Sequence, residues 1–218
     1  MRGRDYFKMD KNTTQIISIR IQKTMENLKK NNMEPYYVDS CAQVVDLVKK
    51  LCPEGRKVSY GGSMTLEECG VLNLLRSGKY EFLDRAAKGA DPDAVMHQAF
   101  SCDTYFMSTN AITENGELYN VDGRGNRVAA LIYGPKNVIV IAGYNKIVSD
   151  LNAAAHRVCE MAAPANTLRL NLNTPCTKVG VCCDCHSADR ICCNFVVSKY
   201  QKIPGRIKVI IVGEPLGY

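Results

Sequence analysis

The sequence predicts an α/β fold in which a mostly parallel sheet is covered by helices on both faces. Three observations support this class. Strand-like and helix-like segments alternate through the first half of the chain, closely spaced strand-like runs follow from Glu117, and six cysteines gather within residues 176–193. These features indicate, in turn, parallel strands, an antiparallel hairpin insertion and a cysteine-rich C-terminal segment. With 218 residues we expect a single domain, 1–218, that includes the cysteine-rich segment 174–193.

The first half supplies the alternating elements. An apolar stripe at helical spacing predicts the first helix, Ser40 is placed to cap the second, and Pro53 stops it. Asp91-Pro92 has the pattern of an N-cap followed by proline at the first helical position. The expected helices are 12–31, 40–51, a short one around 66–75, and 91–101; the expected strands are 36–38, 57–60, 80–83 and 104–108.

The second half changes pattern. Strand-like runs at 117–121, 127–133 and 138–142 are separated by little more than the turn pairs Asp122-Gly123 and Gly134-Pro135. They predict the hairpin or meander that interrupts the α/β order. A helix over 146–161 follows, which Pro164 is expected to end, and 207–212 is the last strand.

Charge and hydropathy exclude some function classes. The net charge is +6, and the lysines and arginines are dispersed, whereas a nucleic-acid-binding surface would concentrate them. The first ten residues lack the apolar core of a secretory signal, and no stretch approaches the ~18 apolar residues of a membrane span. We therefore expect a cytoplasmic protein with no nucleic-acid partner and no membrane span. An anionic small molecule is compatible with this charge.

The cysteine-rich segment predicts a metal site, because thiolates are soft metal ligands. Four cysteines fit the spacing Cys-x5-Cys-x2-Cys-x6-Cys: Cys176, Cys182, Cys185 and Cys192. They suit a [4Fe–4S] cluster or structural zinc. Disulfides, which are rare in the cytoplasm, and inert or redox-active thiols are the alternatives. Cys183 and Cys193 are the reserve ligands. The remaining five are expected to be buried hydrophobes: Cys41, Cys52, Cys69, Cys102 and Cys159.

The junction Tyr60-Gly61-Gly62-Ser63-Met64-Thr65 predicts an anion site. Glycines allow close backbone approach, the following helix start presents free N–H groups, and Ser63 or Thr65 adds a hydroxyl. The alternative is a simple helix entry with a serine cap. A second polar run after strand 104–108 contains Asn110, Glu114, Asn126 and Arg127.

We expect Asn110, Asn126 and Arg127 to help bind the anion, and Glu114 to act as a general acid, base or nucleophile if partly buried. Here the alternative is turn chemistry, with Asn115-Gly116 and Asp122-Gly123 as hairpin turns.

These runs together resemble the lactate-utilisation (LUD) domain family, in particular its short members with a cysteine-rich C-terminus. The resemblance covers nearly the whole chain and rests on 60–66, 108–116, 122–134, 143–146 and 174–192. It implies a three-layer α/β/α fold like that of glucosamine-6-phosphate deaminase, ribose-5-phosphate isomerase and the CoA transferases. In that superfamily the glycine-rich loop, here Gly61, Gly62 and Ser63, holds phosphate or CoA, and Glu114 matches the acidic position. Longer members tend to have threonine where this chain has Asn115.

Family members are similar to a subunit of a bacterial system that oxidises L-lactate with iron–sulfur partner proteins. The resemblance therefore implies a protein that binds a small anionic metabolite and works beside iron–sulfur proteins, as an oxidoreductase-associated subunit. Two alternatives stay open: an isomerase, deaminase or transferase of the superfamily, and a non-catalytic redox or assembly subunit with structural zinc. The sequence leaves the substrate and the oligomeric state open.

Overall fold

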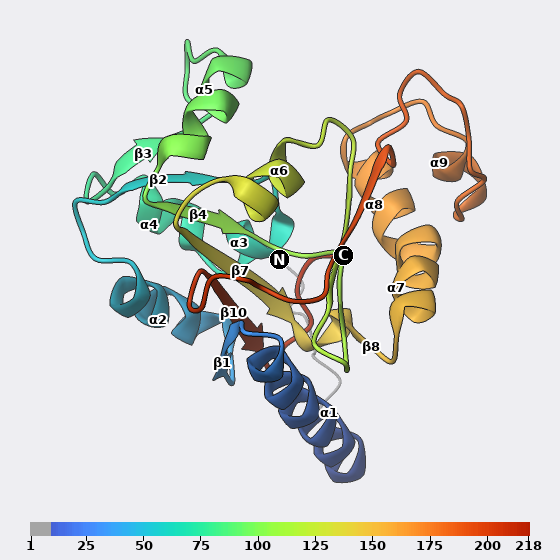
Figure 1. Ribbon diagram of the computed structural model, residues 1–218. Helices are drawn as coiled ribbons and strands as arrows, with labels where there is room; N and C mark the ends of the chain where they lie inside the picture. Colours follow the sequence, from blue (N-terminus) through green and yellow to red (C-terminus); the bar gives the residue numbers. More distant parts are fainter. Residues whose placement is uncertain (1–9) are drawn as a thin grey trace, which may run out of the picture.

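A computed structural model describes residues 10–218. Residues 1–9, which include most of the segment examined for a secretory signal, lie outside the described residues. The centre of the molecule is a six-stranded sheet in the order β1-β10-β7-β4-β2-β3, and every pairing in it is parallel (Figure 1). Its strands are β1 (Glu34–Val38), β10 (Ile207–Val212), β7 (Asn137–Gly143), β4 (Thr104–Met107), β2 (Lys57–Tyr60) and β3 (Glu81–Leu83).

Helices cover both faces of this sheet. On one face α1 (Lys11–Lys30), η2 (Ala99–Ser101) and α6 (Asn126–Tyr133) pack against alternate side chains of β4, β7 and β10, such as Val140 and Val209. On the other face lie α2 (Val44–Leu51), α3 (Met64–Glu68) and α4 (Val71–Leu75), over Ile139, Ile141 and their neighbours. Successive residues of β7 alternate between the two cores, as strand geometry requires. The predicted three-layer α/β/α fold is confirmed.

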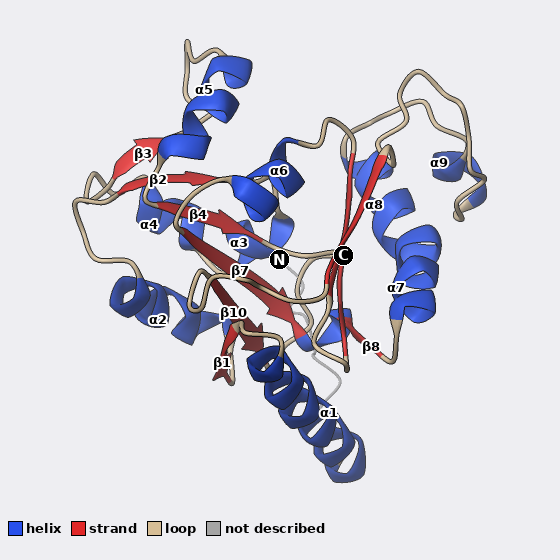
Figure 2. Cartoon of the chain, in the orientation of Figure 1, coloured by secondary structure: helices blue, strands red, loops and turns tan. Residues whose placement is uncertain are grey.

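A second, four-stranded sheet stands beside the first, in the order β8-β5-β6-β9 (Figure 2). Its strands are β8 (Ile147–Val148), β5 (Ala111–Thr113), β6 (Leu118–Asp122) and β9 (Asn194–Ser198). Strands β5 and β6 form an antiparallel hairpin, so a hairpin insertion exists, although the partner of β6 is 111–113 and the predicted run 138–142 belongs to the parallel sheet. Gly116 in its turn has φ +77°, and a Cβ there would lie 2.5 Å from the α1 backbone. The hairpin turn therefore needs glycine both for its conformation and for its contact with α1.

One long helical segment covers the second sheet. It consists of α7 (Leu151–Arg157), the π turn η4 (Val158–Ala162) and α8 (Ala163–Arg169), and its Ala154 and Val158 pack on Tyr119 and Val121. The short elements of the chain are η1 (Cys41–Gln43), α5 (Pro92–Gln98), η3 (Tyr144–Lys146) and α9 (Cys176–Val179).

The strand expected at 127–133 is wrong: this run is helix α6. The Asp122 carboxylate accepts hydrogen bonds from the backbone N–H groups of Arg127 and Val128, both at 3.1 Å, and so satisfies the free donors of the first turn. Val128 and Leu131 lie three residues apart on the buried face. At the other end the buried Arg206 donates to the carbonyl oxygens of Ala130 and Leu131, where positive charge is favoured.

The helix expected to end at Pro164 continues to Arg169. A proline inside a helix removes one hydrogen bond and clashes with the preceding turn. Here the π turn just before it widens the helix, and Pro164 falls in the first turn of α8, where its missing N–H costs little. Within residues 10–218, no helix combines the length and apolar character needed to cross a membrane.

Candidate functional site

The carboxyl ends of β2, β4 and β7 meet at a cavity of ≈ 70 Å³, which we call the basic pocket. Ligand sites of open α/β sheets form at this edge. Its lining is Gly62, Ser63, Met64, Thr65, Ser108, Thr109, Asn110, Arg127, Lys146, Ala162, Asn166, Arg169 and Tyr218. A second cavity of ≈ 320 Å³, the outer pocket, adjoins it and shares six of these residues: Gly62, Asn110, Arg127, Ala162, Asn166 and Arg169.

Lys146 is the buried cation of the basic pocket. It ends η3 just after β7, it is 3% exposed, and its Nζ lies 3.0 Å from Ser108 Oγ and 3.1 Å from Thr65 Oγ1. Burial, together with the positive charges of Arg157 and Arg127, lowers the pKa of Lys146 to about 7. The amine is therefore close to its titration point at neutral pH.

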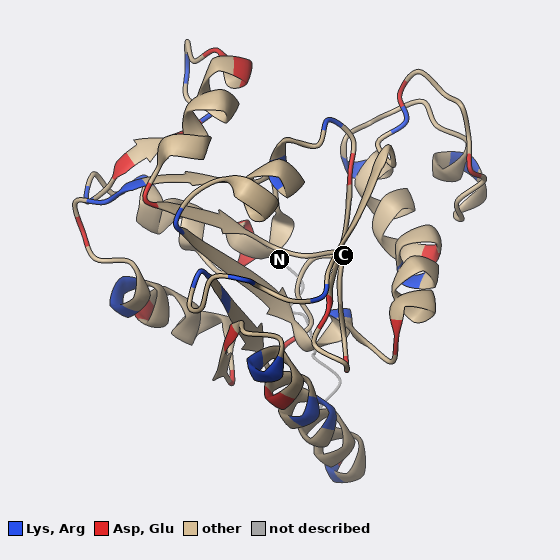
Figure 3. Cartoon of the chain, viewed as in Figure 1, with Lys and Arg blue, Asp and Glu red and all other residues tan. Residues whose placement is uncertain are grey.

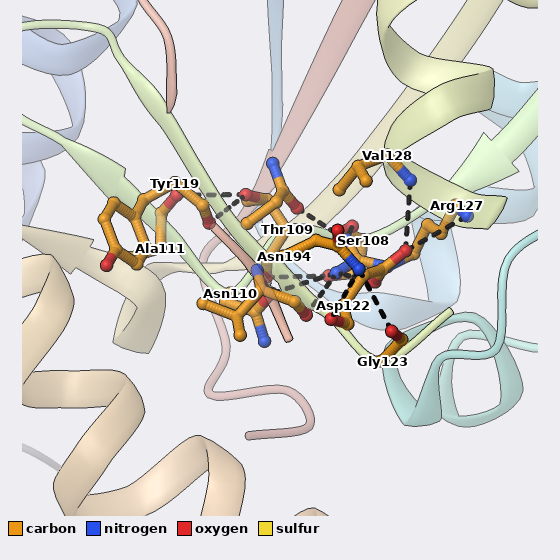
Figure 4. A network of polar contacts seen from close by, with 12 residues as sticks. Ser108, Thr109, Asn110, Ala111, Tyr119, Asp122, Gly123, Arg127, Val128 and Asn194 are labelled. Carbon is orange, nitrogen blue, oxygen red and sulfur yellow. Dashed lines mark hydrogen bonds and ion pairs between the residues drawn. The ribbon is translucent and has the colours of Figure 1, made fainter. Parts of the chain in front are cut away.

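Arg127 holds the loops of the pocket together (Figure 4). Its guanidinium donates to the side chains of Asp122, Asn110 and Asn120 and to the backbone carbonyls of Ser108 and Val121. A guanidinium has five N–H donors, and these five acceptors occupy all of them. Arg127 therefore contributes shape and partly neutralised charge to the pocket, without a free donor for a ligand.

Further arginines surround the two cavities. The half-buried Arg157 of α7 donates to the carbonyl oxygens of Asn110, at 2.6 Å, and Asn145. Arg169, which is exposed, bonds Asn166 across one turn of α8, and Arg85 stacks its guanidinium on the Tyr60 ring and lines the outer pocket. No aspartate or glutamate is among the residues that line the basic pocket. Lysines and arginines elsewhere are spread over the described chain, with a concentration on α1 (Figure 3).

Most of the residues expected to bind an anion come together. Gly62, Ser63, Thr65, Asn110 and Arg127 line the basic pocket, and Asn126 lines the outer pocket. Ser63 also caps α3 through Leu66 N, so the serine-cap alternative holds at the same time. Helix α3 has only five residues, so its dipole is small and the cations dominate the electrostatics.

Gly61 does not line either cavity. A Cβ there would lie 2.8 Å from Arg127 Cγ, so this glycine allows the Arg127 stem to pack against the backbone. A Cβ on the next residue, Gly62, would collide with the Arg85 guanidinium. The lack of a side chain at Gly61 leaves room for Arg127, and its lack at Gly62 leaves room for Arg85.

Glu114 lies apart from the basic and outer pockets. It follows β5, where Oε1 is 2.6 Å from Arg20 Nε and Oε2 is 2.9 Å from Lys23 Nζ on α1. The hydrogen bond from Lys23, with that from Arg20, holds the pKa of Glu114 below its usual value against the effect of burial. The adjoining Asn115-Gly116 is a hairpin turn, as the turn alternative supposed. This geometry favours a structural role for Glu114 as the link between hairpin and helix.

The cysteine-rich segment folds over α8 and forms a third, mainly apolar cavity of ≈ 120 Å³, the cysteine pocket. All four predicted ligands line it, together with two further cysteines; the six are Cys159, Cys176, Cys182, Cys183, Cys185 and Cys192. Cys176 Sγ lies 3.3 Å and 3.2 Å from the hydroxyls of Thr167 and Thr174. Asp184 N donates to Cys182 Sγ at 3.4 Å. Donors placed around sulfur are what a thiolate ligand requires.

The donor set of the cysteine pocket therefore fits a thiolate-bound metal. Within residues 10–218, all eleven cysteines are free thiols, and no three ligating side chains converge closely enough to form a ready metal site. Burial, together with the nearby Cys182, raises the pKa of Cys192 to about 11. Such thiols need a metal cation, or closer approach of positive charge, to become thiolates.

Sequence reasoning missed Lys146, Ser108, Asn166 and Arg169 as site residues. The pattern predicted a helix starting at Lys146, although a lysine three residues after the end of a buried strand indicates the functional edge of a sheet. Asn166 and Arg169 lie beyond Pro164, where the helix was expected to have ended. Cys159 was expected to be an ordinary buried residue.

The fold and the basic pocket define an α/β/α protein with a polar cavity at the carboxyl edge of its parallel sheet. Residues 21–212 match the model of the LUD domain, and the chain belongs to this family. It is also similar to a crystal structure of a DUF162 family protein from Deinococcus radiodurans, with a TM-score of 0.51 at 14% identity; the match covers 91% of this chain and 98% of that one.

A match to eIF2B beta from Chaetomium thermophilum has a TM-score of 0.37 at 18% identity, and it covers 51% of this chain and 43% of that one. At that score it carries no weight. The sequence matches no curated protein.

Proposed function

We propose that this chain is a lactate-utilisation-like protein that binds a small anionic metabolite in the basic pocket. The observation that carries the proposal is the buried Lys146, held by Thr65 and Ser108 in a cavity that Arg127 and Arg169 also line and no aspartate or glutamate does. An anion would relieve the repulsion among these cations. A cavity of ≈ 70 Å³ favours a carboxylate or phosphate group, with the rest of a larger ligand in the outer pocket.

We further propose that the cysteine pocket holds a metal centre, an iron–sulfur cluster or zinc, and that the protein is cytoplasmic and works with iron–sulfur partner proteins. The support is the set of soft thiol donors on one apolar cavity, with hydroxyl and amide donors beside two of the sulfurs. A bound cluster would supply one-electron chemistry, whereas zinc would supply only a structural link.

Calorimetric titration with L-lactate, pyruvate and inorganic phosphate tests the anion half. We expect wild-type protein to bind at least one of them and Lys146→Met to weaken that binding at least tenfold. Lys136→Met, which removes an exposed lysine outside both cavities, is the matched control and keeps wild-type affinity. Wild-type protein that binds none of the three anions, or Lys146→Met that binds as well as wild type, contradicts this half.

Anaerobic purification tests the metal half. A brown protein that contains iron and sulfide supports the cluster. Colourless protein with stoichiometric zinc supports a structural metal and removes the redox role. Protein that holds neither metal, and takes up neither on reconstitution, contradicts the metal half.

The state of Lys146 favours one enzymatic alternative. A buried amine with a pKa lowered to about 7 has the property of lysines that form Schiff bases. Its lone pair could attack the carbonyl carbon of a 2-oxo acid, and loss of water would leave an imine. Borohydride treatment in the presence of pyruvate would then reduce the imine by hydride transfer and add a fixed mass to the peptide that contains Lys146. Absence of this adduct in wild type excludes the imine route and leaves binding.

A further inference from the structure

Cys159 stands outside the cysteine-rich segment, seventeen residues before Cys176, yet it lines the same cavity. It lies in the π turn η4, on the helical segment that covers the second sheet. A π turn places an extra residue in a helix, and such turns are frequent at functional sites. One wall of the cysteine pocket is therefore formed by the helical segment 151–169, and the others by the cysteine-rich segment.

Cys159 makes the closest link between that helix and the loop. The backbone N–H of Cys182 donates to the carbonyl oxygen of Cys159 at 2.8 Å, and both residues line the cysteine pocket. Cys182 is the first residue of the central Cys-x2-Cys pair, and this bond ties it to the helix rather than to the loop.

The other cysteines fall into two groups. Cys176 begins α9 and is 8% exposed, and Cys192 packs against the core between α8 and the second sheet. Cys176 Sγ lies 3.3 Å from the Thr167 hydroxyl of α8, whereas Cys185 contacts Arg190 within the loop. Cys183 and Cys193 are exposed, and Cys193 is not part of the lining.

We propose that Cys159 is a ligand of the metal centre and completes a set with Cys176, Cys182 and Cys192, with Cys185 outside the first coordination shell. This assignment rests on the metal half of the proposed function. On binding, the four thiols lose their protons to solvent and four thiolates surround the metal. Arg190 donates to the carbonyl oxygens of Cys185 and Cys192, so its positive charge lies beside the anionic centre.

The assignment changes what the metal would do. Four ligands confined to the loop would tie the loop only to itself. With Cys159 in the set, the metal would fasten the segment between α9 and β9 onto the helix that also carries Asn166 and Arg169 to the basic pocket. Structural metal sites contribute directly to folding stability, so this link would order that wall of the pocket.

Loading the full-length protein with Co²⁺ under anaerobic conditions tests the assignment, because thiolate-to-cobalt absorption intensity reports the number of thiolate ligands. We expect Cys159→Ser to lose about one ligand's share of that intensity, or to weaken Co²⁺ binding at least tenfold. Cys185→Ser is expected to match both wild type and Cys183→Ser, the exposed control. Circular dichroism and the urea midpoint of the metal-free variants show whether each has folded.

Cysteine alkylation of the wild type gives a second measurement that needs no variant. In metal-loaded protein we expect iodoacetamide to spare Cys159, Cys176, Cys182 and Cys192 and to modify Cys183, Cys185 and Cys193, as read by peptide mass mapping. Alkylated Cys159 with a protected Cys185, in protein that binds one equivalent of metal, overturns the assignment and leaves the proposed function intact. Wild-type protein that binds no metal overturns both.

Discussion

The amine of Lys146 lies 3.0 Å from the hydroxyl of Ser108, which joins the last residue of η3 to the residue after β4. Thr65, on the helix that follows β2, takes a second hydrogen bond from the same amine. One lysine therefore fastens together the ends of three neighbouring strands. Lys146 is therefore the group through which a change in pH should alter ligand binding.

Anion affinity should fall as pH rises through about 7. Lys146 is protonated below its lowered pKa of about 7 and neutral above it, so the charge that attracts an anion is lost in that window. Pyruvate is a suitable probe, since its carboxylate does not titrate there. Titrations between about pH 6 and about pH 8.5 should show weaker binding at the higher pH. Lys146→Met should bind weakly at every pH, and a wild-type affinity independent of pH would exclude this role of the amine.

Substituting Arg127 should mainly lower stability, whereas substituting Arg169 should mainly weaken anion binding. Arg127→Met leaves the Asp122 carboxylate buried without its guanidinium partner, and should lower the unfolding free energy by about 3 kcal/mol. Arg169→Met removes an exposed charge from the pocket wall, so stability should change by less than about 0.5 kcal/mol while anion affinity falls. Urea unfolding and calorimetry on the same two variants measure both quantities. The opposite pattern would show that Arg127 binds the ligand and Arg169 does not.

Glu114→Gln should affect stability and spare ligand binding. The change removes the charge that pairs with Arg20 and Lys23, a contribution of about 1 kcal/mol for partly exposed pairs. Because the folded-state pKa of Glu114 is lowered, this contribution is present above the unfolded-state pKa of about 4.3 and is lost as pH falls through the folded value. The stability difference between wild type and variant should therefore shrink in acid. Loss of anion binding in Glu114→Gln would show instead that Glu114 belongs to the anion site, as the sequence predicted.

Anion binding should alter the absorption spectrum of the metal-loaded protein. Val158, Ala163, Ile191 and Cys192 line both the outer pocket and the cysteine pocket, so a ligand and a metal would be neighbours. A nearby anion changes the electrostatic environment of the metal–thiolate bonds. We expect pyruvate or phosphate, at concentrations that saturate calorimetric binding, to shift the thiolate-to-cobalt bands. An unchanged spectrum at saturation would show that the two sites are electronically independent.

The layers of the fold could be predicted because they depend on periodicity. Apolar residues recur at helical spacing in α1, and β7 and β10 contain the apolar runs 138–142 and 209–212, which are typical of strands buried in a parallel sheet. The run 127–133 could not be assigned in this way. Its seven residues have a strand-like composition, and it is a helix because Asp122 and Arg206 satisfy its two ends from outside the run. Arg206 is more than seventy residues away in sequence.

The candidate site was only partly predictable for the same reason. Gly62, Ser63 and Thr65 follow directly from a strand–turn–helix junction, which is a local pattern. The use of every Arg127 donor within the protein depends on Ser108, Asn110 and Asn120, which only the folded chain brings around it. Cys159 shows no sign in the sequence of belonging with cysteines some twenty residues further on, since a tertiary contact with Cys182 places it there.

The π turn at 158–162 sets the direction in which the side chains of the following helix point around its axis. Successive residues of an α-helix are separated by about 100° around its axis, so a helix with one residue fewer would turn Asn166 and Arg169 by that angle relative to Cys159. Both side chains would then leave the basic pocket while Cys159 kept its place. Deleting Glu160 or Met161, which line none of the three pockets, should therefore take Asn166 and Arg169 away from the basic pocket while Cys159 stays in the cysteine pocket.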